Sequence, residues 1–161
     1  MLIRPLDPTQ DFSAVTAFQA EAADYWLLAD GLCDPAQQAA AFFTECPPSC
    51  DPAQSHHLGL CHNDRLSGLA ELSFGFPEQR DAYLGLMILA PRLRGKGAGP
   101  ILLAHIEGLA RAAHAPQLYL AVLERNPRGW AFWTRMGFAA TGLNRFDADT
   151  GHTIHRLVKP L

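Results

Sequence analysis

The sequence contains the segment Leu84-Gly-Leu-Met-Ile-Leu-Ala-Pro-Arg-Leu-Arg-Gly-Lys-Gly-Ala-Gly-Pro-Ile-Leu-Leu103. An apolar run leads into a basic, glycine-rich turn, which opens into an amphipathic stretch. This order predicts a strand, a turn and a helix. The first N–H groups of a helix lack intrahelical partners, the helix dipole makes that end positive, and glycines let a phosphate approach the backbone. The segment therefore predicts a site for a phosphate-bearing ligand.

Two common phosphate-binding motifs do not fit this turn. A P-loop requires Ser or Thr directly after its lysine to hold magnesium, but Lys96 is followed by Gly97 and Ala98. A dinucleotide fingerprint requires G-x-G-x-x-G, whereas Gly95, Gly97 and Gly99 are spaced two apart. The spacing therefore argues against both of these nucleotide-binding classes.

A third motif, Arg/Gln-x-x-Gly-x-Gly/Ala, fits the turn in two registers, one beginning at Arg92 and the other at Arg94. Pro100 suits the first position of a helix. The residues after it form one apolar stripe at helical spacing: Leu102, Ile106, Leu109 and Ala113. A helix beginning there favours the second register, with Arg94, Gly97 and Gly99. With this motif the chain resembles the GNAT superfamily of acetyl-CoA-dependent N-acetyltransferases.

A second block extends the resemblance. Residues 119 to 138 read Tyr-Leu-Ala-Val-Leu-Glu-Arg-Asn-Pro-Arg-Gly-Trp-Ala-Phe-Trp-Thr-Arg-Met-Gly-Phe. In the superfamily an Asn at this place begins a helix, an aromatic residue follows seven residues later, and Gly-Phe ends the helix. Asn126, Trp133, Gly137 and Phe138 match these positions. Two ordered motifs are more specific than either alone, and together they cover residues 82 to 138.

The resemblance implies an α/β fold with one acetyltransferase domain over residues 1–161. Its mixed central sheet has about six or seven strands with flanking helices and a cofactor cleft between two splayed strands. The acceptor-side elements lie mainly in 1–55 and the acetyl-CoA-binding core in 82–138. Periodicity predicts strands at 2–6, 56–62, 66–76, 83–89, 117–123, 138–143 and 153–159. It predicts helices that are capped by Asp7 and Asp34, one that begins at Pro100 and one over 127–136.

Composition and charge are those of a cytoplasmic domain. The 161 residues, 48% of them hydrophobic, suffice for one domain with a full core. The N-terminus does not resemble a signal peptide, and we expect the four cysteines to be free thiols. The net charge of −3 disfavours a nucleic-acid partner, and no membrane partner is expected. A homodimer is one further expectation.

The charges are unevenly distributed along the chain. Residues 1–51 hold eight acids and one base, whereas the remaining residues hold eight acids and twelve bases. The half with the glycine turn is therefore positive, which suits an anionic cofactor, and the acidic half suits a cationic acceptor. For most of the acids a role as helix caps or solvated surface groups is the alternative.

The resemblance assigns cofactor-binding roles residue by residue. Backbone groups of Met87, Ile88 and Leu89 match the strand that pairs with pantetheine, and the Leu89 N–H would polarise the thioester carbonyl. The pyrophosphate turn is matched by Arg94, Gly95, Lys96, Gly97, Ala98 and Gly99. Asn126 and Trp133 match the contacts from the following helix, although Asn126 also suits a helix cap. Lys96 and Arg92 have a solvated surface cation as the alternative, which we favour for Arg92. The expected cofactor is acetyl-CoA, with coenzyme A as product and no metal.

The chain departs from the superfamily pattern at Trp133. Many members have a Tyr there, which protonates the departing coenzyme A, and an indole cannot serve as an acid. A thiol pKa of about 8.5 lets the thiolate leave without protonation. Tyr119 or Tyr83 are candidate replacements, although tyrosines in strands commonly belong to the core. The departure leaves an alternative function: an acyl-CoA-binding sensor or scaffold with lost or weak catalysis.

The reaction also requires a base to deprotonate the amine. Glu71 is the first choice because it lies in an apolar run, where a carboxylate needs a partner or acquires a raised pKa. A position pointing out of the sheet into solvent is the alternative. The other candidates are Asp24, Asp81, Tyr83 and Glu124.

The resemblance places the acceptor between residues 24–46 and 146–152. Asp24, Tyr25 and Trp26 combine acid and aromatic groups. Such groups bind a small cationic primary amine through ion pairing and cation–π contacts. The group of Cys46, Cys50 and the histidines of 56–62 matches no common zinc spacing.

Overall fold

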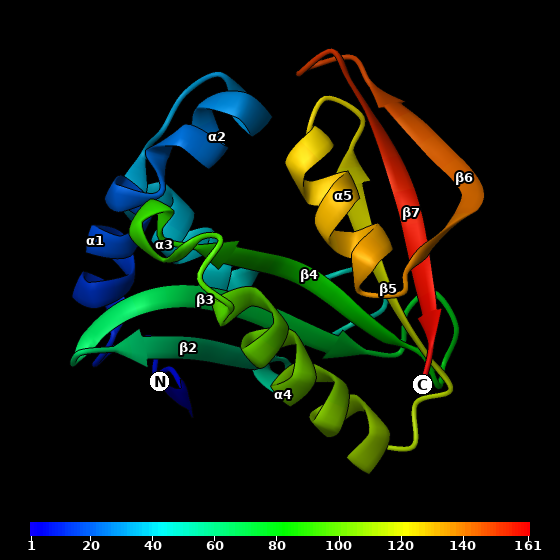
Figure 1. Cartoon of the computed structure of the whole chain (residues 1–161), viewed down its shortest axis with the longest axis horizontal. Coiled ribbons are helices and arrows are strands. Elements are labelled where there is room, and N and C mark those ends of the chain that lie inside the picture. Colours follow the sequence, from blue (N-terminus) through cyan, green and yellow to red (C-terminus); the bar gives the residue numbers. More distant parts are fainter.

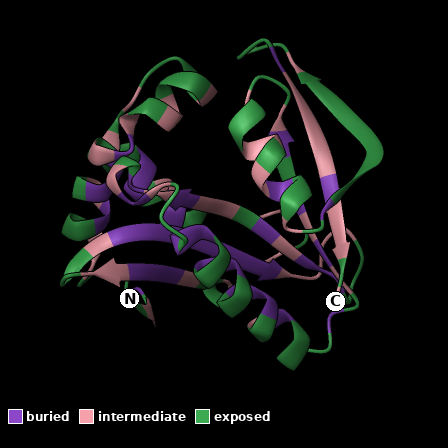
Figure 2. Ribbon diagram, viewed as in Figure 1, coloured by how far each residue is buried: buried purple, intermediate pink, exposed green.

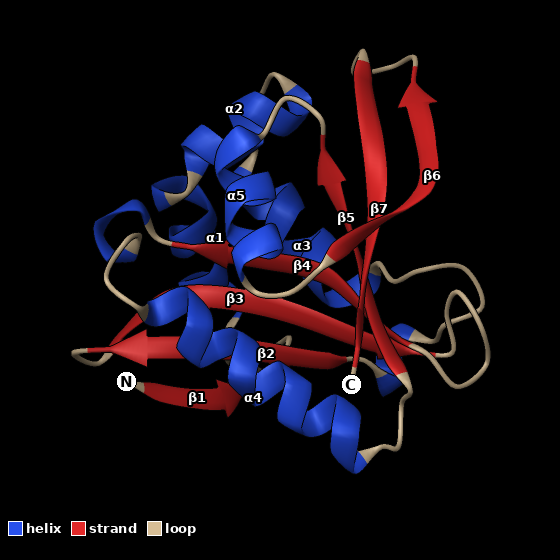
Figure 3. Ribbon diagram, turned by 45° about the vertical axis from the view of Figure 1, so that its right-hand side comes forward, coloured by secondary structure: helices blue, strands red, loops and turns tan.

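A seven-stranded mixed sheet runs through the protein, with helices on both faces (Figures 1 and 3). The computed structural model describes all residues 1–161. The strands are β1 (Leu2–Pro5), β2 (His56–His62), β3 (Arg65–Phe74), β4 (Ala82–Leu89), β5 (Gln117–Leu123), β6 (Ala139–Asp147) and β7 (His152–Pro160). The helices are α1 (Phe12–Glu21), α2 (Ala23–Asp30), α3 (Pro35–Thr44), α4 (Ala98–Ala112) and α5 (Pro127–Arg135), with short 3₁₀ turns at Pro52–Gln54 and Pro91–Leu93. The predicted mixed α/β fold is confirmed.

The strand order is β1-β2-β3-β4-β5-β7-β6. All neighbouring strands are antiparallel except β4 and β5, which α4 connects as a parallel pair. The predicted hairpin between β2 and β3 turns at Asn63 and Asp64, whose φ angles of 51° and 57° are those of a primed turn. The order of elements thus follows the pattern expected from the sequence.

Two hydrophobic clusters lie on opposite faces of the sheet. On one face, Leu69 and Ile88 of the strands pack with Val15, Phe18 and Phe42 of α1 and α3. The other face holds the larger cluster, which α4 and α5 cover. Figure 2 shows the buried residues concentrated in β2, β3 and the inner side of α4, while β6 is exposed along nearly its whole length. The sheet therefore separates a face covered by α1 to α3 from a face covered by α4 and α5.

Two helix starts differ from the predictions, and one helix was not predicted. Asp7 accepts hydrogen bonds from Thr9 and Gln10 in a turn, and α1 begins later, at Phe12. The segment after α1 forms α2, which periodicity did not predict. Helix α4 begins at Ala98 instead of Pro100, because a positive φ of 83° at Gly97 starts the helix two residues earlier.

The parallel pair β4–β5 separates part-way along its length. The two strands pair only over Ala82–Leu84 and Leu118–Leu120. Beyond that point β4 continues to Leu89 and β5 to Leu123, and Figure 1 shows the two strands turning apart. The register between β3 and β4 also shifts next to Glu71. These irregularities leave a gap in the middle of the sheet.

Candidate active site

Two backbone N–H groups of β4 face the gap between β4 and β5. Ala90 N–H donates to the carbonyl of Ser67 across the β3 side at 2.9 Å. Because bonded pairs alternate along an antiparallel ladder, Ile88 also directs its N–H toward β3. The N–H groups of Met87 and Leu89 point the other way, where β5 has already left. Of the three predicted pantetheine-binding positions, Met87 and Leu89 therefore have the geometry to bind a ligand, and Ile88 serves the sheet.

The glycine turn follows directly after β4 and leads into α4. Gly95 and Gly97 have φ angles of 72° and 83°, which other residues rarely adopt, and a Cβ on either would meet no neighbour within 4 Å. The space above the turn is therefore open. Ala98 and Gly99 are buried at the start of α4, whereas Lys96 is exposed. Open space over a helix N-terminus with a free cation is a suitable site for an anion.

Arg92 is part-buried and bonded to two elements, which corrects the expectation of a solvated surface cation. Its Nε donates to Glu21 at 2.8 Å, and its second guanidinium nitrogen donates to Ser67 Oγ at 2.8 Å. Glu21 lies at the end of α1, so this arginine ties α1 to β3. Arg92 therefore has a structural role.

Arg94 connects the turn with α2. Its Nε donates to the carbonyl of Leu89 at 3.0 Å, on the gap side of β4. Its two terminal nitrogens both bond the carboxylate of Asp24, one of them at 3.0 Å. The arginine lowers the pKa of Asp24, mainly through these hydrogen bonds. Two residues predicted for different ligands are thus paired with each other.

The predicted contacts from α5 have structural roles in this arrangement. The Asn126 side chain caps the helix by accepting from Gly129 N–H at 2.9 Å. Trp133 is only 9% exposed and packs edge-on against Phe132 and Phe138. Its indole therefore belongs to the core behind the gap.

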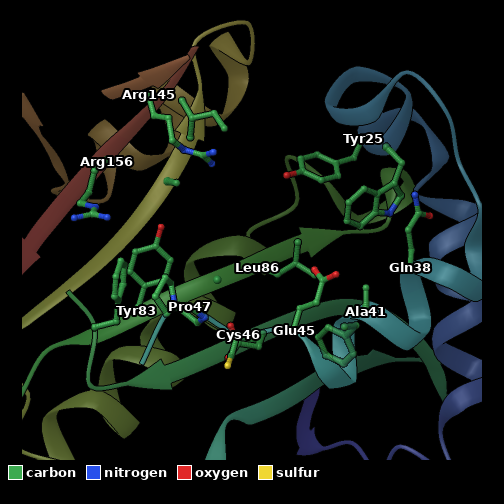
Figure 4. Close-up of a pocket in the computed structure, with 18 of the residues that line it drawn as sticks. Tyr25, Gln38, Ala41, Glu45, Cys46, Pro47, Tyr83, Leu86, Arg145 and Arg156 are labelled. Carbon is green, nitrogen blue, oxygen red and sulfur yellow. The ribbon is translucent and has the colours of Figure 1, made fainter. Parts of the chain in front are cut away.

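A cavity of about 980 Å³ opens on the face of the sheet that carries α2 and α3 (Figure 4). Gly85 and Leu86 of β4 and Ala121 of β5 line it, and these residues stand where the two strands part. Its polar and aromatic lining consists of Tyr25, Trp26, Gln38, Phe42, Glu45, Cys46, Glu71, Phe76, Tyr83, Asn144, Arg145 and Arg156. The gap and the cavity therefore meet at the centre of the molecule.

Glu71 lines this cavity and is 4% exposed, so the alternative of a solvent-pointing carboxylate is wrong. Ser73 Oγ donates to its carboxyl group, and Ser55 Oγ lies 2.7 Å from Ser73 Oγ. Burial raises the pKa of Glu71, while the two serines and the Gly85 backbone oppose the rise. A carboxyl group with a raised pKa beside a cavity is a stronger proton acceptor than an exposed glutamate.

The predicted acceptor residues divide between two places. Tyr25 and Trp26 line the cavity, and the Trp26 indole donates to Gln19 at 2.7 Å, which fixes its ring. Asp24 lies outside the lining and is held by Arg94. The acidic group lining the helical side is instead Glu45, at the end of α3.

The other base and acid candidates are less well placed. Asp81 is buried in a loop, where its carboxylate accepts from Glu78 N–H at 3.2 Å, and Glu124 is exposed beside His155. Tyr119 does not line the cavity, but Tyr83 does. Burial raises the pKa of the Tyr83 hydroxyl, and the nearby Arg156 and Arg145 partly oppose this rise.

Sequence reasoning missed the basic side of the cavity. Arg145 of β6 and Arg156 of β7 line the wall opposite α2 and α3. The only relevant pattern in the sequence is the two-residue spacing of Ile154 and Arg156, which places these two side chains on one face of a strand. The sequence does not say that this face meets the cavity.

No cluster of three or more His, Cys, Asp or Glu side chains is arranged to hold a metal ion. All four cysteines are free thiols. No helix is both long and apolar enough to cross a membrane.

Comparison with known proteins adds a family match. The model of a family described as "Acetyltransferase (GNAT) family" matches residues 17–138. The streptothricin acetyltransferase of Streptomyces lavendulae is 37% identical over 79 residues, which are 49% of this chain and 41% of that protein. An uncharacterized N-acetyltransferase of Mycobacterium tuberculosis is 30% identical over 91 residues, 56% of this chain and 57% of that protein. The chain thus matches less than two thirds of the length of these curated relatives.

Solved structures resemble the chain over a larger part of its length. An acetyltransferase from Thermus thermophilus superposes with a TM-score of 0.73 at 23% identity, covering 100% of this chain and 98% of that one. A nourseothricin acetyltransferase has a TM-score of 0.62 at 26% identity, covering 72% of this chain and 69% of that one.

Proposed function

This chain belongs to the acetyltransferase (GNAT) family, and we propose that it transfers the acetyl group of acetyl-CoA to the primary amine of a small, cationic substrate by direct attack in a ternary complex. One observation carries the proposal. The unpaired N–H groups of Met87 and Leu89 face a gap that opens beside Glu71 into a cavity large enough for an acceptor. Acetyl-CoA and the acceptor amine would thus approach each other from opposite faces of the sheet.

The donor side is supported by the gap and the turn together. Pantetheine fits the gap as an extended chain that accepts hydrogen bonds from the free backbone N–H groups of Met87 and Leu89. The pyrophosphate then lies over the turn of Gly95 to Gly99, where N–H groups and the Lys96 cation face it. An N–H of β4 in hydrogen-bonding distance of the thioester oxygen stabilises the charge of the tetrahedral intermediate, an effect worth about 10²–10³ in rate.

The proposed chemical step uses Glu71 as the base. The amine nitrogen attacks the thioester carbonyl carbon, and its proton passes to the Glu71 carboxylate directly or through one water. The C–S bond then breaks and coenzyme A leaves as the thiolate, which the acidity of a thiol, with a pKa of about 8.5 in cysteine, permits. The Tyr83 hydroxyl is the candidate donor of a hydrogen bond to that sulfur, since it lies in the cavity and burial keeps it protonated.

The acceptor side is supported by Tyr25 and Trp26 on one wall and by the acidic groups of Glu45 and Glu71. Aromatic faces and carboxylates both favour an ammonium group. The names of the antibiotic acetyltransferases among the relatives describe those proteins, and they agree with an amine-bearing small molecule here.

Thiol release from acetyl-CoA tests the proposal. The purified chain is assayed with polyamines, aminoglycosides and basic amino acids, and with neutral amines of the same size. We expect amine-dependent thiol release with a preference for the cationic set. Equal rates for neutral and cationic amines would contradict the proposed substrate class. The absence of any amine-dependent thiol release would contradict the proposed enzymatic function.

The core position of Trp133 favours one other function. A tryptophan buried where many relatives have a tyrosine supplies no acid to the departing thiol. A protein that binds acyl-CoA as a sensor or scaffold accounts for this substitution. Saturable binding of acetyl-CoA without amine-dependent thiol release identifies that function. A cytoplasmic location and a homodimer stay predictions, the second of which sedimentation tests.

A further inference from the structure

Two arginines on one wall of the cavity have no ionic partner. Arg145 and Arg156 line it from β6 and β7. Neither belongs to any of the seven ion pairs of the chain. Figure 4 shows both guanidinium groups on the side of the cavity away from Tyr25 and Gln38. Arginines that line a cavity and have no ion-pair partner are free to bind an anionic ligand.

The sheet holds these two arginines close together. Arg145 stands opposite Ile154 across β6 and β7, and Arg156 lies two residues further along the same face. The two side chains are therefore diagonal neighbours, and like charges at that spacing repel. The Arg156 guanidinium lies over the ring of Phe76, with its carbon 5.0 Å from the ring centre, in a cation–π contact. The fold thus keeps two like charges close together on one face of β6 and β7.

The opposite side of the cavity carries the other sign. Glu71 and Glu45 line it from β3 and α3. A simple monoamine or a polyamine has no group that could pair with Arg145 and Arg156. A molecule with an ammonium group at one end and an anionic group at the other matches both sides.

We propose that the acceptor is an amino carboxylate, whose amine lies beside Glu71 and whose carboxylate is bound by Arg145 and Arg156. The proposal rests on the proposed acetyltransferase function and deepens it by naming the substrate class. Guanidinium groups bind carboxylates through paired N–H donors, which fixes the direction of the acceptor as well as its affinity. The aromatic rings of Tyr25, Trp26 and Phe42 lie along the wall beside it.

Matched acceptors test this inference. The first set consists of L-phenylalanine, L-phenylalaninamide and 2-phenylethylamine, and the second of L-lysine, L-lysinamide and cadaverine. Each set keeps an amine and removes the carboxylate, and the two sets vary the distance between them. We expect kcat/KM to be about tenfold or more higher for the amino acid of at least one set than for its amide and its decarboxylated amine. The amides have more acidic ammonium groups and so offer more free base, which makes this order a stringent one.

Substitutions locate the effect. Arg145→Gln and Arg156→Gln should each lower kcat/KM for the preferred amino acid toward the value of its amide, mainly through KM. Arg111→Gln is the matched control, because Arg111 lies at the far end of α4 on the other face of the sheet and its side chain is 53% exposed. Circular dichroism and tryptophan fluorescence confirm that the variants are folded.

The outcomes separate the two proposals. If amides and decarboxylated amines are acetylated as well as the amino acids of both sets, the carboxylate inference is overturned while the acetyltransferase function stands. The inference is likewise overturned if the amino acids are preferred but both arginine variants keep that preference. If no amine in either set promotes thiol release but a polyamine or an aminoglycoside does, the carboxylate inference is overturned and the acetyltransferase function stands. If none of the amines in either assay promotes thiol release, both proposals fail.

Discussion

Glu71 is the residue on which the proposed chemistry depends most. A carboxyl group in the middle of a strand costs free energy when it ionises, and the serine hydroxyls and Gly85 backbone offset only part of that cost. The result is a proton acceptor whose pKa lies above its ordinary value of 4.5. Such a group changes its charge closer to neutral pH than an exposed glutamate does.

Glu71→Gln should lower kcat by about 10²–10⁴-fold, the range of general base catalysis, with little change in the affinity for acetyl-CoA. In the wild type the pH profile of kcat/KM should rise along an acid limb whose apparent pKa exceeds 4.5, because the carboxylate must be ionised to act. The variant should lose that limb. The measurement is thiol release across the pH range, with Asp64→Asn, an exposed acid in the turn between β2 and β3 and outside the cavity, as the control. An unchanged acid limb in Glu71→Gln would assign the base to another group.

Gly85 is the neighbour that leaves room for this carboxylate. A Cβ at this position would collide with Glu71 Oε2, which is the end of a flexible side chain and so can be displaced. Gly85→Ala should therefore fold but lose most of the activity, because the base is pushed out of place. Gly108→Ala is the matched control, since its Cβ meets nothing within 4 Å and the exchange should stabilise α4 by about 1 kcal/mol. Equal activity of the two variants would show that the position of Glu71 does not matter.

At the scale of elements, the phosphate turn offers a charge test. Gly97→Asp places a negative charge under the proposed pyrophosphate, whereas Gly97→Asn has nearly the same shape without the charge. Both residues tolerate a positive φ such as the 83° of Gly97 and both cap helices, so both variants should fold. We expect the Kd of coenzyme A to rise about tenfold or more in the Asp variant relative to the Asn variant. Calorimetry measures this difference, and equal affinities of the two variants would contradict a pyrophosphate site at the turn.

The sequence predicted most elements because their signals are local. The hairpin turn at Asn63 and Asp64, the cap at Asp34 and the apolar strand before the glycine turn all depend on neighbours in the chain. Helix α2 was missed because its residues lack an apolar stripe, and none of them is buried. Its place is set by contacts such as the bond from Arg94 to Asp24, which joins residues 70 positions apart.

Some residues of the candidate site also had a local signal in the sequence, and others did not. The glycine turn and the aromatic pair Tyr25 and Trp26 carried a visible pattern, and the structure sets Tyr25 and Trp26 on the cavity. For Glu71 the sequence left two orientations open, because strand alternation does not say which face is covered. Arg145 and Arg156 gave no usable signal, since their meaning depends on β7 inserting between β5 and β6.

For the whole molecule, Glu71 makes stability depend on pH. Its pKa is raised in the folded state, so the folded protein binds this proton more tightly than the unfolded chain does. The free energy of unfolding therefore falls as pH rises from about 4.5 through the folded pKa, by about 1.4 kcal/mol for each pH unit that separates the folded pKa from the unfolded one. Glu71→Gln has no such loss.

Urea unfolding of both proteins between about pH 4 and pH 8 measures this effect. The variant and the wild type should be closest at the acidic end, and the variant should be the more stable at the alkaline end. Because all other titrating groups are shared, the difference between the two curves isolates Glu71. Parallel curves would place its folded pKa near the ordinary value.

The pairing of Arg94 with Asp24 links the two substrates thermodynamically. A pyrophosphate that attracts Arg94 leaves Asp24 as an unneutralised acid on the helix that also carries Tyr25 and Trp26. Occupation of the donor site therefore makes the acceptor side more negative, and an ammonium group should then bind more tightly. Exposed ion pairs contribute up to about 1 kcal/mol, so this coupling amounts to no more than about fivefold, and it acts equally in both directions. Calorimetric titration of the acceptor with and without coenzyme A measures that cooperativity, and Asp24→Asn should abolish it.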